Sequence, residues 1–254
     1  MTKAEILTRA FATGQQIAPF SDAEPAFDLA AGYAAQRALT ALRVAAGARI
    51  IGMKVGFTNT LIWAQYGIQA PVHAPVFDTS LATGTVAIGG FMEPQIEPEV
   101  VLKLRATPTP DMDDAALLAC IEAAAPGFEI VHSAYPGWRF KAPDSVASGG
   151  MHGALVLGDW VPVDRSWMDR LTRFRVTLSC DGAVLEVGQA TNLLGAGPLA
   201  VLRHLVSLDS ADPLPAGSLV STGTVTRAMP IQPGQDWHAA FEGLGFAPIR
   251  VRLT

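Results

Sequence analysis

The chain carries, at residues 94–104, the sequence Pro94-Gln95-Ile96-Glu97-Pro98-Glu99-Val100-Val101-Leu102-Lys103-Leu104. Apolar and β-branched residues dominate this stretch, which predicts a strand. Successive side chains of a strand point to opposite faces, so Glu97 and Glu99 share one face. Two neighbouring carboxylates repel each other, and burying them is costly unless a cation accompanies them. The stretch therefore indicates either a divalent-metal site or a solvated strand face on which Pro98 marks an edge or a bulge.

The rest of the chain divides into a shorter part that favours helices and a longer part that favours strands. The spacing of apolar residues predicts helices around residues 6–11 and over 27–46, the second ending at Gly47. Further helices are expected over 111–125 and 198–207. Expected strands cover residues 49–58, 128–131, 153–158, 173–180, 217–224 and 249–253, and Asp181-Gly182 is a hairpin turn signal. These elements predict an α+β fold with a helical N-terminal part.

Length, charge and hydropathy narrow the class of protein. In a chain of 254 residues we expect a helical or mixed part over 1–85 and a β-rich core over 86–254, packed as one compact unit. The chain has 18 Lys and Arg and 23 Asp and Glu, which gives a net charge of −5. A protein with this charge lacks the basic surface that nucleic-acid binding requires. The mean hydropathy is high, at +0.29. Because no apolar run approaches the ~20 residues of a membrane span, we expect no membrane segment and assign the apolar surplus to a core and to the contacts of a homo-oligomer.

Cysteine usage and the first residues indicate the compartment. Cys120 and Cys180 are too few for a disulfide framework. The sequence Met1-Thr2-Lys3-Ala4-Glu5 has no apolar segment of the kind that a secretory signal needs. We therefore expect a cytoplasmic protein in a reducing environment.

Several common chemistries have no motif in this sequence. It contains no G-x-G-x-x-G and no Walker loop, so nucleotide binding has no support. It also lacks the G-x-S-x-G of the α/β-hydrolases and the C-x-x-C and H-E-x-x-H of zinc sites. Glu129 and His132 form a single Glu-x-x-His, whereas a di-iron bundle needs two of them on long helices.

A third acid and a lone lysine stand in apolar surroundings. Glu129 is isolated in the expected strand 128–131, and an acid in such a strand is rarely buried unless it is paired or bound to metal. Three carboxylates make the hard oxygen ligand set that Mg²⁺ prefers. The alternative for Glu129 is an ion pair with Arg139 or Lys141. Lys54, between Met53 and Val55, either reaches solvent or contacts an anion.

In this order and context, these residues resemble the fumarylacetoacetate hydrolase superfamily, and within it the branch of 2-keto-4-pentenoate hydratase and 4-oxalocrotonate decarboxylase. The resemblance runs from about residue 30 to the end of the chain. Its matching stretches are residues 34–37, 51–58, 94–100, 126–131, 144–147 and 217–224. It implies a mixed β-roll or sandwich core with the metal in its mouth, and a homo-oligomer.

The resemblance also implies roles for individual residues. Glu97, Glu99 and Glu129 would be the ligands of Mg²⁺ or Mn²⁺, and Lys54 the active-site lysine. The family has an acid shortly after the lysine strand, for which Asp78 is the nearest candidate. The loop that contains Thr222, Gly223 and Thr224 would offer backbone N–H groups to a substrate carboxylate, the alternative being a plain turn.

The implied reaction is metal-assisted chemistry on a small 2-oxo or 2-hydroxydienoic acid from the breakdown of aromatic compounds. A hydratase belongs to the lyases. In such an enzyme the cation stabilises the negative charge of an enolate formed from the substrate, and a base activates the water that adds to the conjugated double bond. Asp78 is the first candidate for this base, and His73 and His152 are further ones.

Other reactions stay open on the same scaffold. Ala134 after Ser133, and Ser148-Gly149 after the 144–147 motif, depart from the pattern of this branch at positions near the substrate. A decarboxylase would use the same chelate as an electron sink, and a C–C hydrolase of the acylpyruvate type would direct water onto a carbonyl. The alternative outside the enzymes is a non-catalytic partner subunit. The three acids argue against it, because burying them together is costly and a subunit without a catalytic role gains nothing from it.

Overall fold

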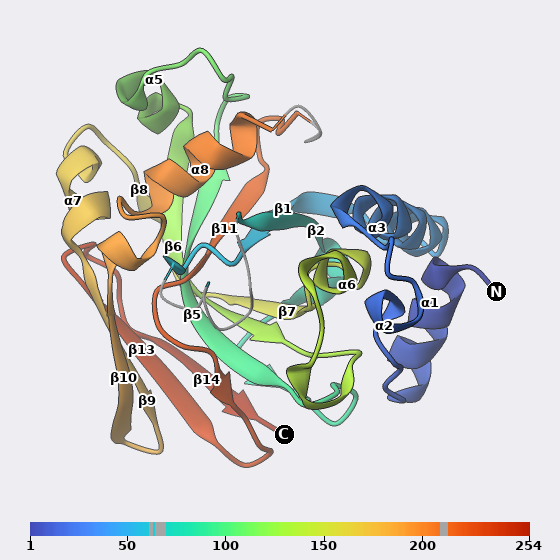
Figure 1. Cartoon of the computed structure of the whole chain (residues 1–254). Helices are drawn as coiled ribbons and strands as arrows, with labels where there is room; N and C mark the ends of the chain where they lie inside the picture. Colours follow the sequence, from blue (N-terminus) through green and yellow to red (C-terminus); the bar gives the residue numbers. More distant parts are fainter. Residues whose placement is uncertain (61–62, 64–69, 209–212) are drawn as a thin grey trace.

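The computed structural model describes residues 1–60, 63, 70–208 and 213–254. Within these residues the strands form a nine-stranded mixed sheet and a five-stranded sheet. The larger sheet has the order β2-β1-β11-β5-β6-β7-β3, with β12 beside β5 and β8 beside β6. The smaller sheet has the order β10-β9-β13-β14-β4, and Figure 1 shows its strands at the lower left of the molecule.

Two long antiparallel strands, β5 (Gln95–Leu104) and β6 (Ile121–Val131), form the middle of the larger sheet. Ile96, Val100 and Leu102 of β5 are fully buried in the main hydrophobic core. The alternate side chains, among them Glu97 and Glu99, point to the opposite face. The predicted strand over 94–104 is therefore confirmed, and it is central in the sheet rather than solvated.

The other strands are short, and several lie far apart in the chain. In the larger sheet they are β1 (Ile50–Gly56), β2 (Val72–Phe77), β3 (Leu81–Ala82), β7 (His152–Leu157), β8 (Val161–Pro162), β11 (Leu219–Thr224) and β12 (Met229–Pro230). In the smaller sheet they are β4 (Thr85–Val86), β9 (Arg175–Cys180), β10 (Ala183–Gln189), β13 (Asp236–Glu242) and β14 (Ile249–Leu253). β1 pairs in parallel with β11, which places residues 50–56 beside residues 219–224.

The α-helices form two groups on either side of the larger sheet (Figure 1). α1 (Lys3–Thr13), α2 (Phe20–Ala23), α3 (Leu29–Ala45) and α6 (Ala142–Ala147) gather beside β1 and β2. α5 (Asp114–Ala119), α7 (Trp167–Arg173) and α8 (Pro198–Val206) lie at the other side. The described residues also contain the 3₁₀ turns η2 (Asp78–Ser80), η3 (Pro136–Trp138) and η4 (Ala190–Asn192). In the described part of the chain no helix is long and apolar enough to cross a membrane.

The N-terminal helices have an apolar cluster of their own. Leu7 of α1 and Leu39 of α3 pack there with Phe27 and with Tyr135 and Met151 from the loops around α6. α1 begins with a capping box between Thr2 and Glu5, and α3 begins at the N-cap Asp28. These helices therefore pack on one another and on the loops around α6.

The predicted α+β class is confirmed, and most elements lie where the sequence places them. α3 ends at Ala45, and Gly47 follows with φ +101°, as expected of the residue after a helix. The turn at Asp181-Gly182 joins β9 to β10 with positive φ at both residues. The division expected at residue 85 falls inside β4, and β1, β2 and β3 pair with strands that follow it.

The helix predicted over 111–125 is wrong in its second half. Asp113 caps α5, but the helix ends at Ala119, and Ile121 already belongs to β6. The strand expected over 128–131 is only the end of this longer strand. Ala123, Ala124 and Ala125 are buried between β5 and neighbouring strands, because pairing within the sheet overrides the helical preference of alanine.

Candidate metal centre

Three glutamates meet on one face of the β5–β6 pair. Glu97 lies directly opposite Glu129 in the ladder, and Glu99 is two residues along β5. Gly127 faces Glu99 on β6, where a Cβ atom would come within 2.8 Å of a Val101 methyl carbon. Carboxylate oxygens of the three glutamates lie within 4.8 Å of one another, so the group can hold a metal ion. Glu99 and Glu129 have no exposed surface, and Glu97 is half-buried.

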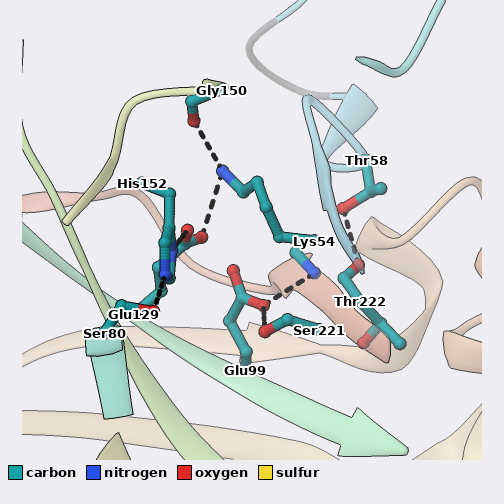
Figure 2. Close-up of polar contacts among 10 residues, drawn as sticks. Lys54, Thr58, Ser80, Glu99, Glu129, Gly150, His152, Ser221 and Thr222 are labelled. Atoms are coloured by element: carbon teal, nitrogen blue, oxygen red, sulfur yellow. Dashed lines mark hydrogen bonds and ion pairs between the residues drawn. The ribbon is translucent and has the colours of Figure 1, made fainter. Parts of the chain in front are cut away.

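Lys54 reaches this group from β1, which is separated from β5 by β11. It is buried, with 3% of its surface exposed. Its Nζ donates to the carbonyl of Gly150 at 2.9 Å and lies 3.1 Å from Oε2 of Glu129. Figure 2 shows the ammonium group between these two partners. The positive φ of Gly150, +66°, belongs to the turn after α6 that brings this carbonyl to the lysine.

A bulge in β11 turns two donors onto Glu99. The β11–β5 register shifts between Ser221, opposite Val101, and Thr224, opposite Glu99. Two residues of β11 therefore face one residue of β5. Oγ of Ser221 donates to Oε2 of Glu99 at 2.5 Å, and the N–H of Gly223 donates to the same oxygen at 2.9 Å (Figure 2). Glycine is required at 223, because φ is +85° and a Cβ atom would lie 1.9 Å from Oγ1 of Thr58.

His152, at the start of β7, fixes the third glutamate. Its Nδ1 lies 2.7 Å from Oε1 of Glu129, and its Nε2 lies 2.8 Å from Oγ of Ser80 (Figure 2). The imidazole thus spans the gap between a potential metal ligand and η2. Such a contact orients a ligand carboxylate. The sequence had suggested His152 only as a base.

Two oxygens of the group have unused hydrogen-bonding capacity. Oε1 of Glu99 accepts no hydrogen bond from the described residues, and Oε2 of Glu129 has the Lys54 ammonium as its neighbour but no well-oriented hydrogen bond. Buried polar atoms without partners are rare, and they often mark the place of an ion. Carboxylate oxygens suit hard divalent cations. The residues present therefore fit a divalent metal ion.

The charges of this cluster change the pKa of each member. Burial raises the pKa of Glu97 to about 7, although Lys54 opposes the shift. Burial, together with the charges of Glu129 and Glu97, raises the pKa of Glu99 well above its ordinary value. Burial alone would raise the pKa of Glu129 too, but Lys54 and His152 lower it overall. Burial alone would lower the pKa of Lys54, but the three carboxylates raise it overall, so the lysine is held as an ammonium ion.

A cavity of about 240 Å³ opens beside the cluster. This is below the usual 300–1,000 Å³ of drug-sized sites and suits a small ligand. Its wall includes four residues already described, which are Lys54, Glu97, Gly223 and Gly150. The other lining residues are Gly56, Phe57, Thr58, Asn59, Val72, Gln95, Val131, Trp138, Phe140, Ser145, Met151, Thr224, Thr226, Arg227 and Ala228.

The loop predicted to bind substrate is only partly available for that role. Gly223 and Thr224 line the cavity, but Thr222 does not. The hydroxyl of Thr222 donates to the carbonyl of Val100, and its own carbonyl accepts from Thr58. The N–H of Gly223, expected to meet a substrate carboxylate, is bonded to Glu99 instead. In this structure the loop therefore binds the carboxylate of Glu99.

Asp78 is not brought to the cavity. It follows β2 at the end where Phe77 pairs with Ile50, whereas Lys54 is four residues further along β1. Both of its carboxylate oxygens are bonded to Arg49, at 2.9 and 2.8 Å, and these bonds lower its pKa. The role of base predicted for Asp78 therefore has no support from its position.

The structure also bears on two other expectations, a role for His73 as a base and an ion pair between Glu129 and Arg139. His73 stacks on Tyr33 with ring centroids 4.7 Å apart and is not part of the cavity wall. Arg139 pairs with Asp22 at 3.0 Å, so the alternative ion pair between Arg139 and Glu129 is wrong. Glu129 pairs instead with Lys54.

Comparison with known proteins decides the family. The model of the fumarylacetoacetate (FAA) hydrolase C-terminal family matches residues 55–252. The chain belongs to this family. The resemblance seen in the sequence is thereby confirmed, and the matched range contains all three glutamates of the cluster.

Relatives of the chain include hydratases and a decarboxylase. The chain is 32% identical to 2-keto-4-pentenoate hydratase 1 of Dechloromonas aromatica, over 95% of this chain and 93% of that one. It is 28% identical to a 4-oxalocrotonate decarboxylase of a Pseudomonas species, over 83% and 82%. The 4-oxalocrotonate decarboxylase of Pseudomonas putida G7, solved with magnesium and adipate, superposes with a TM-score of 0.91 at 25% identity, covering 99% of this chain and 96% of that one. The same protein was also solved with calcium and acetate. These complexes and the carboxylate cluster support a divalent metal ion in this chain.

Proposed function

We propose that the protein is a divalent-metal-dependent hydratase that adds water to a 2-hydroxy-2,4-dienoate or a 2-oxo-enoate, as a 2-keto-4-pentenoate hydratase does. The observation that carries the proposal is the convergence of Glu97, Glu99 and Glu129 beside the Lys54 ammonium, in a cavity of small-molecule size. Relatives named 2-keto-4-pentenoate hydratase, at about 30% identity over most of the chain, support the reaction. An enzyme of this type is a lyase.

The three glutamates would hold Mg²⁺ or Mn²⁺, both of which accept carboxylate oxygens. When bound, the cation supplies a Lewis acid for the substrate carboxylate and 2-oxygen. Lys54 adds a second positive centre and stabilises negative charge that develops on the substrate. The Gly150 carbonyl and Glu129 hold its ammonium group in place. In this arrangement Lys54 would act as a fixed positive charge beside the substrate.

The other walls of the cavity position the substrate. Trp138 and Phe140 supply an apolar surface for the diene, and Ser145, Thr224 and Thr226 supply polar groups. Apolar walls also exclude water from the side of the enolate, which strengthens the charge interactions there. A non-catalytic partner would have no reason to keep three acids buried together at this cost.

A decarboxylase of 2-oxo-3-enedioates is the second candidate. The decarboxylase of P. putida G7 superposes over almost the whole chain, which favours this reading. The same cation and Lys54 would then stabilise the charge left by departing CO₂, and no water would be added.

One assay separates the two reactions. Purified protein is mixed with 2-hydroxypenta-2,4-dienoate or with 2-oxohex-3-enedioate, with Mg²⁺ or with EDTA, and absorbance and CO₂ are recorded together. The hydratase predicts loss of the dienoate chromophore with Mg²⁺ and no CO₂. Release of CO₂ from the enedioate, with no loss of the dienoate, would assign the decarboxylase. Turnover that survives EDTA would refute both.

We also propose a homo-oligomer in the cytoplasm. Exposed apolar side chains on β10, Val184 and Val187, and the high mean hydropathy support contacts between copies. Both cysteines are free and buried, as expected in a reducing compartment. Light scattering on the eluting protein tests the first point, and a mass equal to the 26.7 kDa of one chain would refute it.

A further inference from the structure

The two fully buried glutamates of the cluster each have one carboxylate oxygen engaged by the protein and one left over. Oε2 of Glu99 accepts from Oγ of Ser221 at 2.5 Å and from the N–H of Gly223 at 2.9 Å (Figure 2). Oε1 of Glu99 is buried and accepts no hydrogen bond from the described residues. A carboxylate oxygen has about two lone-pair sites, and the two donors use both of those on Oε2. Glu99 can therefore offer a metal ion a single oxygen.

The oxygens of Glu129 are divided in a similar way. Oε1 lies 2.7 Å from Nδ1 of His152, whereas Oε2 has the Lys54 ammonium at 3.1 Å and no well-oriented hydrogen bond. Oγ of Ser80 donates to the carbonyl of Phe77 at 2.7 Å and lies 2.8 Å from Nε2 of His152, so both ring nitrogens have a partner. The imidazole is thus held against Oε1, and binding a cation through both oxygens would require Glu129 to turn away from it.

The segment that engages Glu99 is itself fixed. The hydroxyl of Thr222 donates to the carbonyl of Val100 at 2.8 Å, and the carbonyl of Thr222 accepts from Oγ1 of Thr58 at 2.9 Å. Ser221 and Thr222 are at most 1% exposed. The bulge of β11 is therefore bonded on both sides, and its two donors to Glu99 have little freedom to move.

Divalent cations differ in the oxygens that they require. Ca²⁺ takes roughly six to eight oxygens in flexible sites, and it often takes two of them from one carboxylate. Mg²⁺ takes about six in a near-ideal octahedron, in which the two oxygens of one carboxylate lie too close together to occupy neighbouring corners. Glu99 and Glu129 present one oxygen each, and Glu97 can add at most two. Such a rigid set of few oxygens suits the smaller ion.

We infer that the metal centre selects a small octahedral cation such as Mg²⁺ over Ca²⁺, and that Ser221 and His152 determine this selectivity by engaging one oxygen of Glu99 and one of Glu129. Both are positioning residues, because they act on the cation through the glutamates. The inference rests on the proposed function, since it assumes that the three glutamates bind the cation used in the reaction. It adds to that function the basis on which the cation is chosen.

Binding of the two ions to the metal-free protein tests the inference without turnover. The full chain is treated with EDTA and freed of the chelator, and titration calorimetry then gives the dissociation constants of Mg²⁺ and of Ca²⁺. We expect the wild type to bind Mg²⁺ at least as tightly as Ca²⁺. Ser221→Ala should raise the affinity for Ca²⁺ relative to Mg²⁺ about tenfold, the size of one charge-assisted hydrogen bond, because Glu99 can then turn both oxygens to the cation.

Conservative and matched variants separate this effect from a general loss of packing. Ser221→Thr keeps the hydroxyl and should keep the wild-type ratio of the two constants. Ser179→Ala is the matched control, because it removes a half-buried hydroxyl that donates to the carbonyl of His238 in the second sheet. His152→Leu should shift the ratio toward Ca²⁺, as Ser221→Ala does, whereas His152→Asn keeps an N–H near the position of Nδ1 and should not.

The inference is overturned if the wild type binds Ca²⁺ more tightly than Mg²⁺, or if Ser221→Ala or His152→Leu folds and leaves the ratio unchanged. The wild-type ratio decides the matter even where a variant fails to fold, which circular dichroism detects. Selective binding of Mg²⁺ without turnover of the dienoate or the enedioate would refute only the proposed reaction. Turnover with Mg²⁺ by a protein that prefers Ca²⁺ would refute only this inference.

Discussion

At the scale of single residues, the site depends on carboxylates that would repel one another without a cation. Glu129 is the most constrained of them, because it faces Glu97 across the ladder and contacts both Lys54 and His152. Its charge is stabilised by these two neighbours, whereas burial raises the pKa of Glu97 and Glu99. Glu129 is therefore the member of the cluster that is already ionised when a cation arrives.

Replacing Glu129 by Gln should remove a ligand with little change of shape. We expect the affinity for Mg²⁺ and Mn²⁺ to fall on the order of 100-fold or more, because loss of even an outer contact to a ligand costs 10- to 100-fold. Titration calorimetry of the metal-free protein measures it. The matched control is Glu122→Gln, also on β6, whose exposed side chain pairs with Lys103. Equal metal affinity in the Glu129 variant and this control would contradict the metal centre.

The sequence identified the charged members of the site but not the groups that hold them. Glu97, Glu129 and Lys54 stand out because each is a charge in an apolar strand, and burial makes such residues conspicuous. Asp78 is a candidate because the family resemblance implies an acid shortly after the lysine strand. The antiparallel register of β1 and β2 carries it to the other end of β1, where it meets Arg49. The Gly150 carbonyl leaves no side-chain signal at all, so no reading of residue types would have found it.

At the scale of elements, the environment of a strand is hard to predict from sequence, because it depends on pairing with strands that lie far away in the chain. The sequence predicts β5 and β11, and one of the two alternatives it leaves for β5 is a solvated face on which Pro98 marks an edge or a bulge. The structure has Pro98 buried in a central strand, opposite Phe128 and next to the bulge of β11. The irregular ladder there tolerates a residue that has no N–H group. Only the pairing partner, which lies over a hundred residues away, reveals this.

The close approach of β1 to β11 depends on Gly52. A Cβ atom at this position would lie 2.0 Å from the carbonyl oxygen of Leu219, its partner in the parallel pair. We expect Gly52→Ala to push β1 away and to lower the free energy of unfolding by about 3 kcal/mol, as overpacking does. Urea unfolding followed by circular dichroism measures the loss. Gly89→Ala is the control, because nothing lies within 4 Å of its Cβ position. A Gly52 variant as stable as this control would show that β1 can move freely.

At the scale of the whole molecule, a buried histidine joins the N-terminal helices to the sheet. His132, 6% exposed, lies just after β6 with its ring against Phe11 of α1 and Phe91. Burial, with the charges of Arg43 and His152, lowers its pKa to about 4. In the unfolded chain a histidine titrates near 6.5. The unfolded state therefore binds a proton first as the pH falls, and the stability that neutral His132 provides is present above pH 6.5 and lost toward pH 4.

We expect this histidine alone to make the free energy of unfolding fall by about 3 kcal/mol between pH 6.5 and 4, by the linkage of 1.36 kcal/mol per pKa unit. The variant His132→Leu should flatten the dependence by that amount, because its position no longer titrates. Urea titrations at half-unit steps of pH measure the slopes. His238→Leu, a half-buried histidine of β13, is the comparison and should flatten it less. Parallel slopes for the wild type and the His132 variant would show that the acid sensitivity arises elsewhere.

The metal should stabilise the fold as a whole, because its ligands and their supports come from strands far apart in the chain. β5 and β6 supply the glutamates, β11 supplies the donors to Glu99, β1 supplies Lys54 and β7 supplies His152. A cation that binds only the folded state at 100 times its dissociation constant adds about 2.7 kcal/mol. For a domain of this size that corresponds to a rise in Tm of about 5–10 °C. Scanning calorimetry of the protein in Mg²⁺ and in EDTA measures the difference. Glu129→Gln should show no such difference, and an equal rise in both proteins would place the stabilising cation at some other site.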